Sequence, residues 1–230
     1  MATVKGPYDA VFLDFYGTVS AGDRDAVLAA CRKVLSVFQL PLTADELAVA
    51  WGEHFFTVVD RSNHTEFQTL YQCELQSLRE TIGGWVGPFD PAPFVEELEA
   101  YWRNPPLHED VLSGLSNVRV PICCVSNADA EPLHTAIGRH GLRFDAVVCS
   151  EHSRCYKPDP VIFQRAVEAL RVDPKRAIHV GDSLHSDVSG ASKLGIATAW
   201  INRGGRIHDI GTCAANFHLS TLDDLAELLG

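Results

Sequence analysis

The second half of the chain alternates short apolar segments with helical patterns, and this alternation limits the possible folds more than any other feature of the sequence. Apolar segments expected to form strands cover residues 118–125, 144–149, 177–180 and 196–201. Patterns typical of helices cover 131–140, 159–170, 187–194 and 222–229. Strands and helices that alternate at this spacing form βαβ units, which predicts an α/β fold with a doubly wound parallel sheet.

The first half of the chain has a different character. One short apolar strand, 11–13, is followed by helical patterns over 23–38, 43–60, 64–82 and 91–102, with few β-branched runs. Asn104-Pro-Pro106 then separates this helical part from the alternating part. We therefore predict an α/β core domain built from residues 1–19 and 106–230, with an all-helical domain of residues 20–105 inserted after the first strand.

Charge and composition exclude several classes of partner. The chain has 19 basic and 30 acidic residues, a net charge of −11, so binding to nucleic acid or to an anionic membrane surface is not expected. No apolar stretch approaches the ~20 residues that a membrane span requires. The seven cysteines show no zinc-like spacing, and their odd number without a leader peptide predicts a reducing, cytoplasmic location. Nothing in the sequence indicates the oligomeric state.

Asp14 is the first candidate for a functional residue. It directly follows the apolar strand Val11–Leu13 and precedes Gly17-Thr18, which favour a tight turn whose amides and hydroxyl face a ligand. An acid in this position can also simply accept hydrogen bonds from the turn. Because ligands bind beyond the carboxyl ends of the strands in α/β sheets, Asp14 is placed where a ligand would be expected.

Two further segments follow strands in the same way. Ser126-Asn127 ends an apolar strand, so its hydroxyl and amide are candidates for donating hydrogen bonds to an anionic substrate, although such residues are also common in turns. Lys157 lies between a strand and a helix that is capped by Asp159 and Pro160. A cation here would neutralise both an aspartate and a bound anion, whereas most lysines are simply solvated.

Asp182 and Asp187 complete the set of candidates. Asp182 follows the strand 177–180, and Asp187 lies five residues later, where a helix is expected. Two nearby carboxylates repel each other unless a positive charge lies between them. Mg²⁺ is the natural candidate because it prefers oxygen ligands. Asp187 could otherwise be a helix N-terminal acid that the helix dipole favours.

Taken in order, these segments resemble the motifs of the haloacid dehalogenase superfamily. The four motifs are D-x-x-G-T at Asp14 to Thr18, S-N at Ser126, K-P at Lys157, and G-D-x-x-x-x-D at Asp182 to Asp187. The resemblance implies a Rossmann-like core and identifies residues 20–105 as the first type of helical cap found in the superfamily. It covers nearly the whole chain.

The resemblance also implies a role for each candidate. Asp14 would be the nucleophile that forms a covalent aspartyl intermediate, and Thr18, Ser126 and Lys157 would orient it and hold the transferring group. Mg²⁺ would be held by Asp14, Asp182, Asp187 and the backbone carbonyl of Tyr16, and would offset charge on a phosphoryl oxygen.

Tyr16 departs from the pattern of the superfamily's phosphatases, in which the residue two positions after the nucleophile is an aspartate that acts as general acid and base. A phenol with a pKa of about 10 cannot replace a carboxylate as a base near neutral pH, but its position beside the nucleophile keeps Tyr16 among the predicted catalytic residues, with Asp14, Thr18 and Lys157. Three hypotheses follow: an Mg²⁺-dependent phosphatase that is slow or restricted to good leaving groups, a metal-independent 2-haloacid dehalogenase, and a binding protein with little or no activity.

The dehalogenase hypothesis accounts for Tyr16, because superfamily dehalogenases carry D-x-Y-G-T and release a halide that needs no proton. Against it, dehalogenases typically carry S-x-N-x-x-D in place of Gly181-Asp182 and have an arginine after a cap tryptophan, whereas Gly52 and Glu53 follow Trp51 here. Arg32 and Arg61 are possible substitutes. A phosphonatase would need a cap lysine, and Lys33 is poorly placed for that role.

The retained acids favour an Mg²⁺-dependent phosphatase acting on a small phosphorylated metabolite, with the dehalogenase as the alternative. The sequence does not identify the substrate. Several aromatic residues of the cap are candidates for pocket walls, although at helical spacing such residues are more often part of a core: Trp51, Phe55, Phe56, Tyr71 and Trp85.

Overall fold

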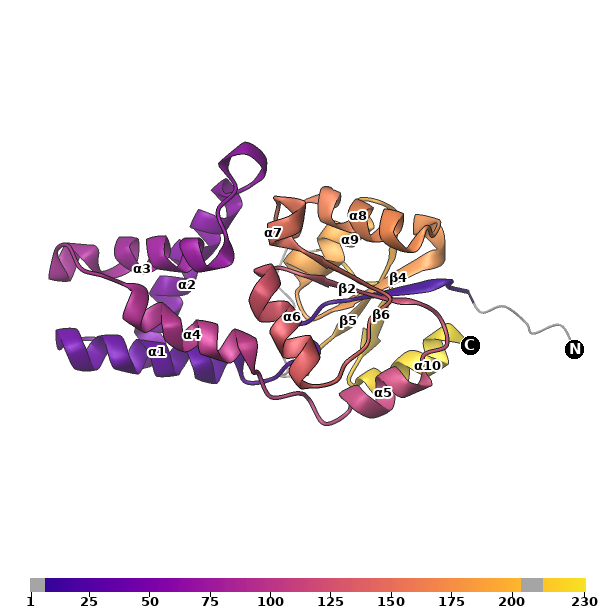
Figure 1. Ribbon diagram of the computed structural model, residues 1–230, viewed down its shortest axis with the longest axis horizontal. Helices are drawn as coiled ribbons and strands as arrows, with labels where there is room; N and C mark the ends of the chain where they lie inside the picture. Colours follow the sequence, from indigo (N-terminus) through magenta and orange to yellow (C-terminus); the bar gives the residue numbers. More distant parts are fainter. Residues whose placement is uncertain (1–6, 204–212) are drawn as a thin grey trace, which may run out of the picture.

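A parallel sheet of six strands forms the centre of the protein (Figure 1). The computed structural model describes residues 7–203 and 213–230. The sheet has the order β3-β2-β1-β4-β5-β6, and every neighbouring pair is parallel. The strands are β1 (Ala10–Leu13), β2 (Ile122–Ser126), β3 (Ala146–Cys149), β4 (Ala177–Gly181), β5 (Ala197–Ile201) and β6 (Phe217–Leu219). This order confirms the predicted doubly wound α/β fold, because the chain starts in the middle of the sheet and winds toward each edge in turn.

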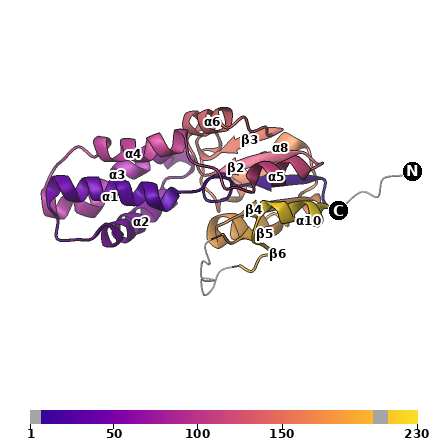
Figure 2. The ribbon, with the colours of Figure 1, turned by 90° about the horizontal axis from the view of Figure 1, so that it is seen from below.

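Helices cover both faces of the sheet, as Figures 1 and 2 show. On one face, Val11 and Leu13 of β1 share an apolar cluster with residues of α5 (Val111–Asn117), α6 (Ala130–Arg139) and α10 (Leu225–Leu229). On the other face, Phe12 packs in a cluster with residues of α8 (Pro160–Leu170) and α9 (Gly190–Ser192). The alternation of side chains along a strand therefore buries both faces of β1, which explains why its sequence is apolar throughout.

Four helices between β1 and α5 form a second body beside the sheet (Figure 2). They are α1 (Asp23–Phe38), α2 (Ala44–Arg61), α3 (Leu70–Val86) and α4 (Ala92–Arg103), and they enclose an apolar cluster of their own. A capping box between Thr43 and Glu46 opens α2. The chain crosses between the two bodies at adjacent points, where Ala21 donates its backbone N–H to the carbonyl of Pro106 at 2.8 Å. We propose these crossings as domain limits and call residues 20–105 the cap.

The structure corrects several predicted boundaries. The helix expected over 64–82 is a 3-10 turn, His64–Glu66, followed by α3, because a capping box between Thr69 and Gln72 starts the helix there. The strand expected over 118–125 begins only at Ile122, since Pro121 has no N–H to donate to the ladder. In place of a helix over 187–194, a π-helical segment over Leu184–Ser189 leads into the short α9.

Helix α5 and strand β6 are among the elements that were not predicted from the sequence. Helix α5 contains Gly114 and two serines, which lower helix propensity, but packing requires the glycine there, since a Cβ on it would lie 2.7 Å from the backbone of Leu222. Strand β6 has only three residues and forms by pairing with β5. In both cases tertiary contacts rather than local pattern define the element.

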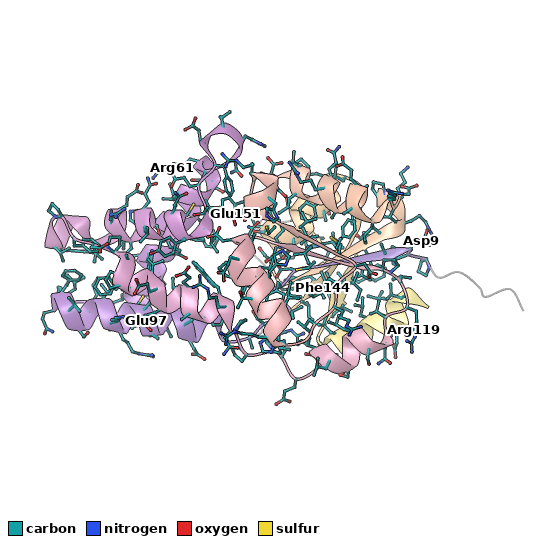
Figure 3. The ribbon with its side chains drawn as sticks, viewed as in Figure 1. Asp9, Arg61, Glu97, Arg119, Phe144 and Glu151 are labelled. Atoms are coloured by element: carbon teal, nitrogen blue, oxygen red, sulfur yellow. The ribbon has the colours of Figure 1, made fainter. Side chains whose placement is uncertain are left out.

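The sheet points the carboxyl ends of its strands toward the cap. In Figure 3, Asp9 and Arg119 lie at the end of the molecule farthest from the cap, and these residues precede β1 and β2. Arg61 and Glu97 lie on the cap in the same view. Residues that follow the strands therefore face the space beneath the cap. Among the described residues, no helix has the length and apolar character needed to span a membrane.

Candidate active site

A cavity of about 450 Å³ lies between the carboxyl edge of the sheet and the cap. Asp14 reaches it from the end of β1, Ser126 from the end of β2 and Asp182 from the end of β4. Strands β1 and β4 are neighbours that continue in opposite directions around the sheet, and the crevice at such a switch point is where α/β proteins bind ligands. The predicted candidates therefore converge on one place.

Lys157 is the centre of the charged groups at the base of this cavity. Its Nζ donates to Asp14 Oδ1 at 2.6 Å, to Asp187 Oδ1 at 2.7 Å and to the carbonyl of Val125 at 3.0 Å. Its side chain is only 3% exposed. Burial lowers the pKa of Lys157, but the two carboxylates outweigh burial and raise the pKa above its usual value. Lys157 is therefore a permanent cation that orients both acids.

Asp187 is held from several directions. Its Oδ1 also accepts from His179 Nε2 at 2.9 Å, and its Oδ2 accepts from the backbone N–H of Ser183 at 3.0 Å. Gly181 permits this close approach, because a Cβ there would lie 2.2 Å from the carboxylate carbon of Asp187. Burial raises the pKa of Asp187, but Lys157 and His179 lower it by more, so the carboxyl group stays ionised.

His179 is a member of this group that was not predicted as a site residue. It lies in the middle of β4, is buried, and packs edge-on against the ring of Phe163 at 5.0 Å between ring centroids. The signal was present in the sequence, since a histidine interrupts the otherwise apolar strand 177–180. A polar side chain within a strand buried on both faces needs a partner, and Asp187 is that partner here.

Three carboxylates form a group suited to a divalent cation. Oxygens of Asp14, Asp182 and Asp187 all lie within 4.8 Å of one another. Asp182 packs against Gly17, whose φ of +87° and tight contact leave no room for a side chain: a Cβ would lie 2.8 Å from Asp182 Oδ2. Lys157 contacts two of the three acids, Asp14 and Asp187, and carboxylate oxygens are ligands that Mg²⁺ prefers. The residues therefore fit the predicted metal.

Asp14 has one carboxylate oxygen that the protein leaves without a partner. Oδ1 bonds Lys157, whereas Oδ2 is buried and has no hydrogen bond among the described residues. Burial and the charge of Asp187 raise the pKa of Asp14, and Lys157 opposes the shift. A buried oxygen without a partner is costly in a folded protein, so Oδ2 is the atom of Asp14 that is open to a metal or a substrate.

Tyr16 directs its hydroxyl group toward the cap rather than toward the acids. The phenol donates to the backbone carbonyl of Trp102 at 2.8 Å, and its ring packs edge-on against Phe15. Burial raises the pKa of Tyr16 above its usual value near 10. A neutral phenol with its proton already donated to a carbonyl cannot act as a base, so the structure agrees with the interpretation that this chain lacks the usual acid–base residue. The carbonyl of Tyr16 stays a predicted metal ligand.

The three polar residues predicted around the nucleophile lie in different settings. Ser126 lines the cavity, and its buried Oγ has no hydrogen-bond partner among the described residues. Thr18 Oγ1 is also buried and unpartnered, but Thr18 does not line the cavity. Asn127 uses both ends of its amide on the backbone of Lys157, accepting from its N–H at 2.7 Å and donating to its carbonyl at 3.2 Å. Asn127 therefore positions Lys157, and Ser126 is the side chain open to a ligand.

Comparison with known proteins agrees with this geometry. A family model described as haloacid dehalogenase-like hydrolase matches residues 8–195. This chain belongs to the haloacid dehalogenase-like hydrolases. The match confirms the family that the four motifs predicted and includes Asp14, Ser126, Lys157, Asp182 and Asp187.

Relatives of this hydrolase carry out more than one reaction. N-acylneuraminate-9-phosphatase of Mus musculus is 29% identical over 164 residues, which span 67% of this chain and 64% of the relative. Haloacetate dehalogenase H-2 of Moraxella sp. is 24% identical over 229 residues, 96% of this chain and 97% of the relative. The solved structure of L-2-haloacid dehalogenase from Xanthobacter autotrophicus superimposes with a TM-score of 0.77 at 22% identity, covering 96% of this chain and 98% of that one. Similarity alone thus leaves phosphatase and dehalogenase chemistry open.

The cap supplies the remaining wall of the cavity. Three of the five aromatic residues proposed as pocket walls, Trp51, Phe55 and Phe56, line it. The other two, Tyr71 and Trp85, do not: Trp85 is exposed at the opposite end of α3 from Leu70, about three turns beyond Glu74. Several lining residues were not predicted as walls, since their helical spacing is also that of a core: Val59, Leu70, Glu74, Leu98 and Trp102.

Proposed function

We propose that this hydrolase is an Mg²⁺-dependent phosphatase that acts on a small phosphate monoester through an aspartyl intermediate. The observation that carries the proposal is the position of Asp182 beside Asp14 and Asp187, with oxygens of all three within 4.8 Å. Carboxylates this close to one another repel each other and a phosphate ester. A divalent cation bound among them would remove that repulsion and would give Asp182 a role as a ligand.

The protein's own groups support a reaction in two steps. A carboxylate oxygen of Asp14 attacks phosphorus, and the bond from phosphorus to the leaving oxygen breaks, with solvent supplying the proton. Water then attacks the phosphorus of the aspartyl phosphate, which releases inorganic phosphate and regenerates Asp14. Lys157 fixes the orientation of Asp14, and Ser126 Oγ is available to a phosphoryl oxygen. Bound through Asp14, Asp182 and Asp187, Mg²⁺ would offset negative charge on the phosphoryl group.

The position of Tyr16 restricts the substrates. Its hydroxyl is held by the carbonyl of Trp102, so no side chain at this position protonates the leaving group. General acid catalysis is worth about 10²–10⁴-fold, and the loss is smallest for leaving groups that depart as stable anions. We therefore infer a preference for phosphate esters with good leaving groups.

A 2-haloacid dehalogenase is the second candidate, and Tyr16 together with the dehalogenase relative favours it. A 2-haloacid carries a carboxylate next to the reacting carbon, which calls for a cation in the cavity. Among the described residues that line the cavity, the lysine and the arginine already form ion pairs, Lys157 with Asp14 and Asp187, and Arg24 with Asp45, which leaves His185 as the remaining basic side chain. Arg32 and Arg61, the predicted substitutes for a halide-binding arginine, do not line it.

A parallel assay distinguishes the two candidates. The purified protein is incubated with 4-nitrophenyl phosphate and with 2-chloropropionate, each with Mg²⁺ and with EDTA, and released phosphate and chloride are measured. The proposal predicts phosphate release that requires Mg²⁺ and no chloride release. Chloride release that persists in EDTA, without phosphatase activity, would instead establish the dehalogenase.

A further inference from the structure

The cap end of the cavity is mostly apolar. Helix α2 presents Trp51, Phe55 and Val59 to it at helical spacing, and Leu98 and Trp102 come from α4. A cavity of about 450 Å³ with such walls is typical of sites for small organic molecules. The part of the substrate that points into the cap is therefore expected to be largely apolar.

Glu74 is the exception in this apolar wall. It lies on α3 one turn after Leu70, another residue of the wall, and the backbone N–H of Leu70 is bonded to Asp129 of the core at 2.7 Å. Glu74 is thus one turn farther into the cap than the point where α3 contacts the core. The contacts within the described part of the chain include no hydrogen bond or ion pair of its carboxyl group. Burial raises the pKa of Glu74 to about 8.

A partly buried carboxyl group without a partner is unfavourable unless a ligand supplies a hydrogen bond or an opposite charge. The hydrogen bonds made nearby do not use it: Trp51 Nε1 donates to Ser77 Oγ at 2.8 Å, and Tyr16 donates to the carbonyl of Trp102. Glu74 comes from the cap helix α3, whereas Asp14, Ser126 and Asp182 come from the ends of strands. Glu74 therefore belongs to the part of the cavity that would hold the body of a substrate.

The charges around the cavity favour a cation at this end. Among the described residues that line it, six are acidic and three are basic; Lys157 and Arg24 are already paired with carboxylates, and His185 lies on the segment that follows β4, at the catalytic end. Asp14, Asp182 and Asp187 belong to the catalytic end with Lys157. The cap side keeps Asp23, Asp60 and Glu74, with only Arg24 to balance them.

We propose that Glu74 recognises an ammonium group on the substrate, so that the preferred substrate is a phosphate monoester with an apolar body and a primary amine at its far end. This inference rests on the proposed phosphatase activity and names its substrate class. The phosphate lies at Asp14, the apolar body lies against Trp51 and Phe55, and the amine donates to the carboxylate of Glu74. A carboxylate at the same end of the substrate would meet an acidic wall.

Three aryl phosphates that differ only in their far end test the inference: 4-(aminomethyl)phenyl phosphate, 4-ethylphenyl phosphate and 4-(carboxymethyl)phenyl phosphate. All three release a phenol of similar acidity, so a difference in kcat/KM of about 10-fold or more reports recognition of the far end. With Mg²⁺ present, the ammonium ester is expected to exceed the ethyl ester by about 10- to 100-fold, the range for a hydrogen bond to a charged group. The carboxylate ester is expected to be the poorest substrate.

Two variants locate the effect. Glu74→Gln keeps the size of the side chain but cannot ionise to pair with an ammonium group, so it should remove the preference for the ammonium ester while turnover of the ethyl ester, which makes no such pair, changes less than about 3-fold. Retained turnover of the ethyl ester also shows that the variant is folded. Glu53→Gln is the matched control, because Glu53 is an exposed glutamate of the cap that does not line the cavity, and it should leave the preference intact.

The outcomes separate this inference from the proposed activity. If the ethyl and ammonium esters are hydrolysed equally well, or if Glu74→Gln keeps the preference, the role of Glu74 is wrong and the phosphatase assignment stands. A preference for the carboxylate ester would likewise overturn it. If none of the three esters is hydrolysed with Mg²⁺, the phosphatase assignment fails and the inference fails with it.

Discussion

The two ends of the cavity are built on different principles. At the core end, charged groups lie in direct contact, and Lys157 joins Asp14 and Asp187 at 2.6 and 2.7 Å with almost no exposure to solvent. At the cap end, the wall is apolar and its one partly buried acid, Glu74, has no partner among the described residues. At the core end, the atoms without a partner among the described residues, Asp14 Oδ2 and Ser126 Oγ, are available to the reacting group, whereas at the cap end the carboxyl group of Glu74 is available to the body of the substrate. We infer that the core sets the reaction and the cap selects the molecule.

The same contrast applies to stability. The cap carries an ion pair between Lys33 and Glu97, whose side chains are 41% and 46% exposed, so water screens it. The two ion pairs of Lys157 are buried, so water screens them far less. Without Lys157, both Asp14 and Asp187 would be buried charges without this partner. Loss of the ion pairs in the core is therefore expected to lower the free energy of unfolding strongly, and loss of the ion pair in the cap only slightly.

The largest expected effect is on catalysis at the core end. Asp14→Asn removes the nucleophile and should lower kcat on 4-nitrophenyl phosphate by about 10⁴-fold or more, because loss of a covalent catalyst leaves only binding and electrostatic contributions. Steady-state kinetics measure the loss, and thermal unfolding verifies that the variant is folded. Activity within about 10-fold of the wild type would show that Asp14 is not the nucleophile.

A matched pair of lysine variants tests the contrast in stability. Lys157→Met should lower the free energy of unfolding by about 3–5 kcal/mol, since Asp14 and Asp187 are left buried without a cation. Lys33→Met, in the exposed pair of the cap, should lower it by at most about 1 kcal/mol. Urea unfolding at neutral pH gives both values. Equal losses of unfolding free energy in the two variants would show that the buried ion pairs contribute no more to stability than the exposed one.

The smallest expected effect belongs to the contact between the two regions. Tyr16→Phe removes the hydrogen bond to the carbonyl of Trp102, which should cost about 1 kcal/mol of stability. Because the phenol does not act as acid or base, kcat on 4-nitrophenyl phosphate should change by less than about 3-fold. A fall of 100-fold with unchanged stability would mean that the Tyr16 hydroxyl takes part in the reaction.

The core end was largely predictable from the sequence, and the cap end was not. Asp14, Ser126 and Asp182 each follow an apolar strand, and parallel strands bring their carboxyl ends to one edge, so local pattern predicts three-dimensional proximity. Lys157 and Asp187 lie in motifs attached to that edge. His179 could have been found as a polar residue inside a buried strand.

Glu74 shows why the cap was harder to predict. On an amphipathic helix, residues that line a cavity and residues that pack in a core share the same spacing, so only the packing of α2, α3 and α4 distinguishes them. Trp51 and Tyr71 have similar chemistry, yet one lines the cavity and the other does not. Elements that depend on tertiary contacts, such as α5 and β6, were missed for the same reason.

Direct measurement of Mg²⁺ binding tests the central claim, which is that the acids at the core end hold a divalent cation. Calorimetric titration of the wild type with Mg²⁺ should reveal one site per chain. The same titration of Asp182→Asn should show that binding is lost or strongly weakened, while Asp23→Asn, a variant of an acid on the cap side of the cavity, should bind as the wild type does. Absence of Mg²⁺ binding in the wild type, or equal binding in Asp182→Asn, would contradict the account.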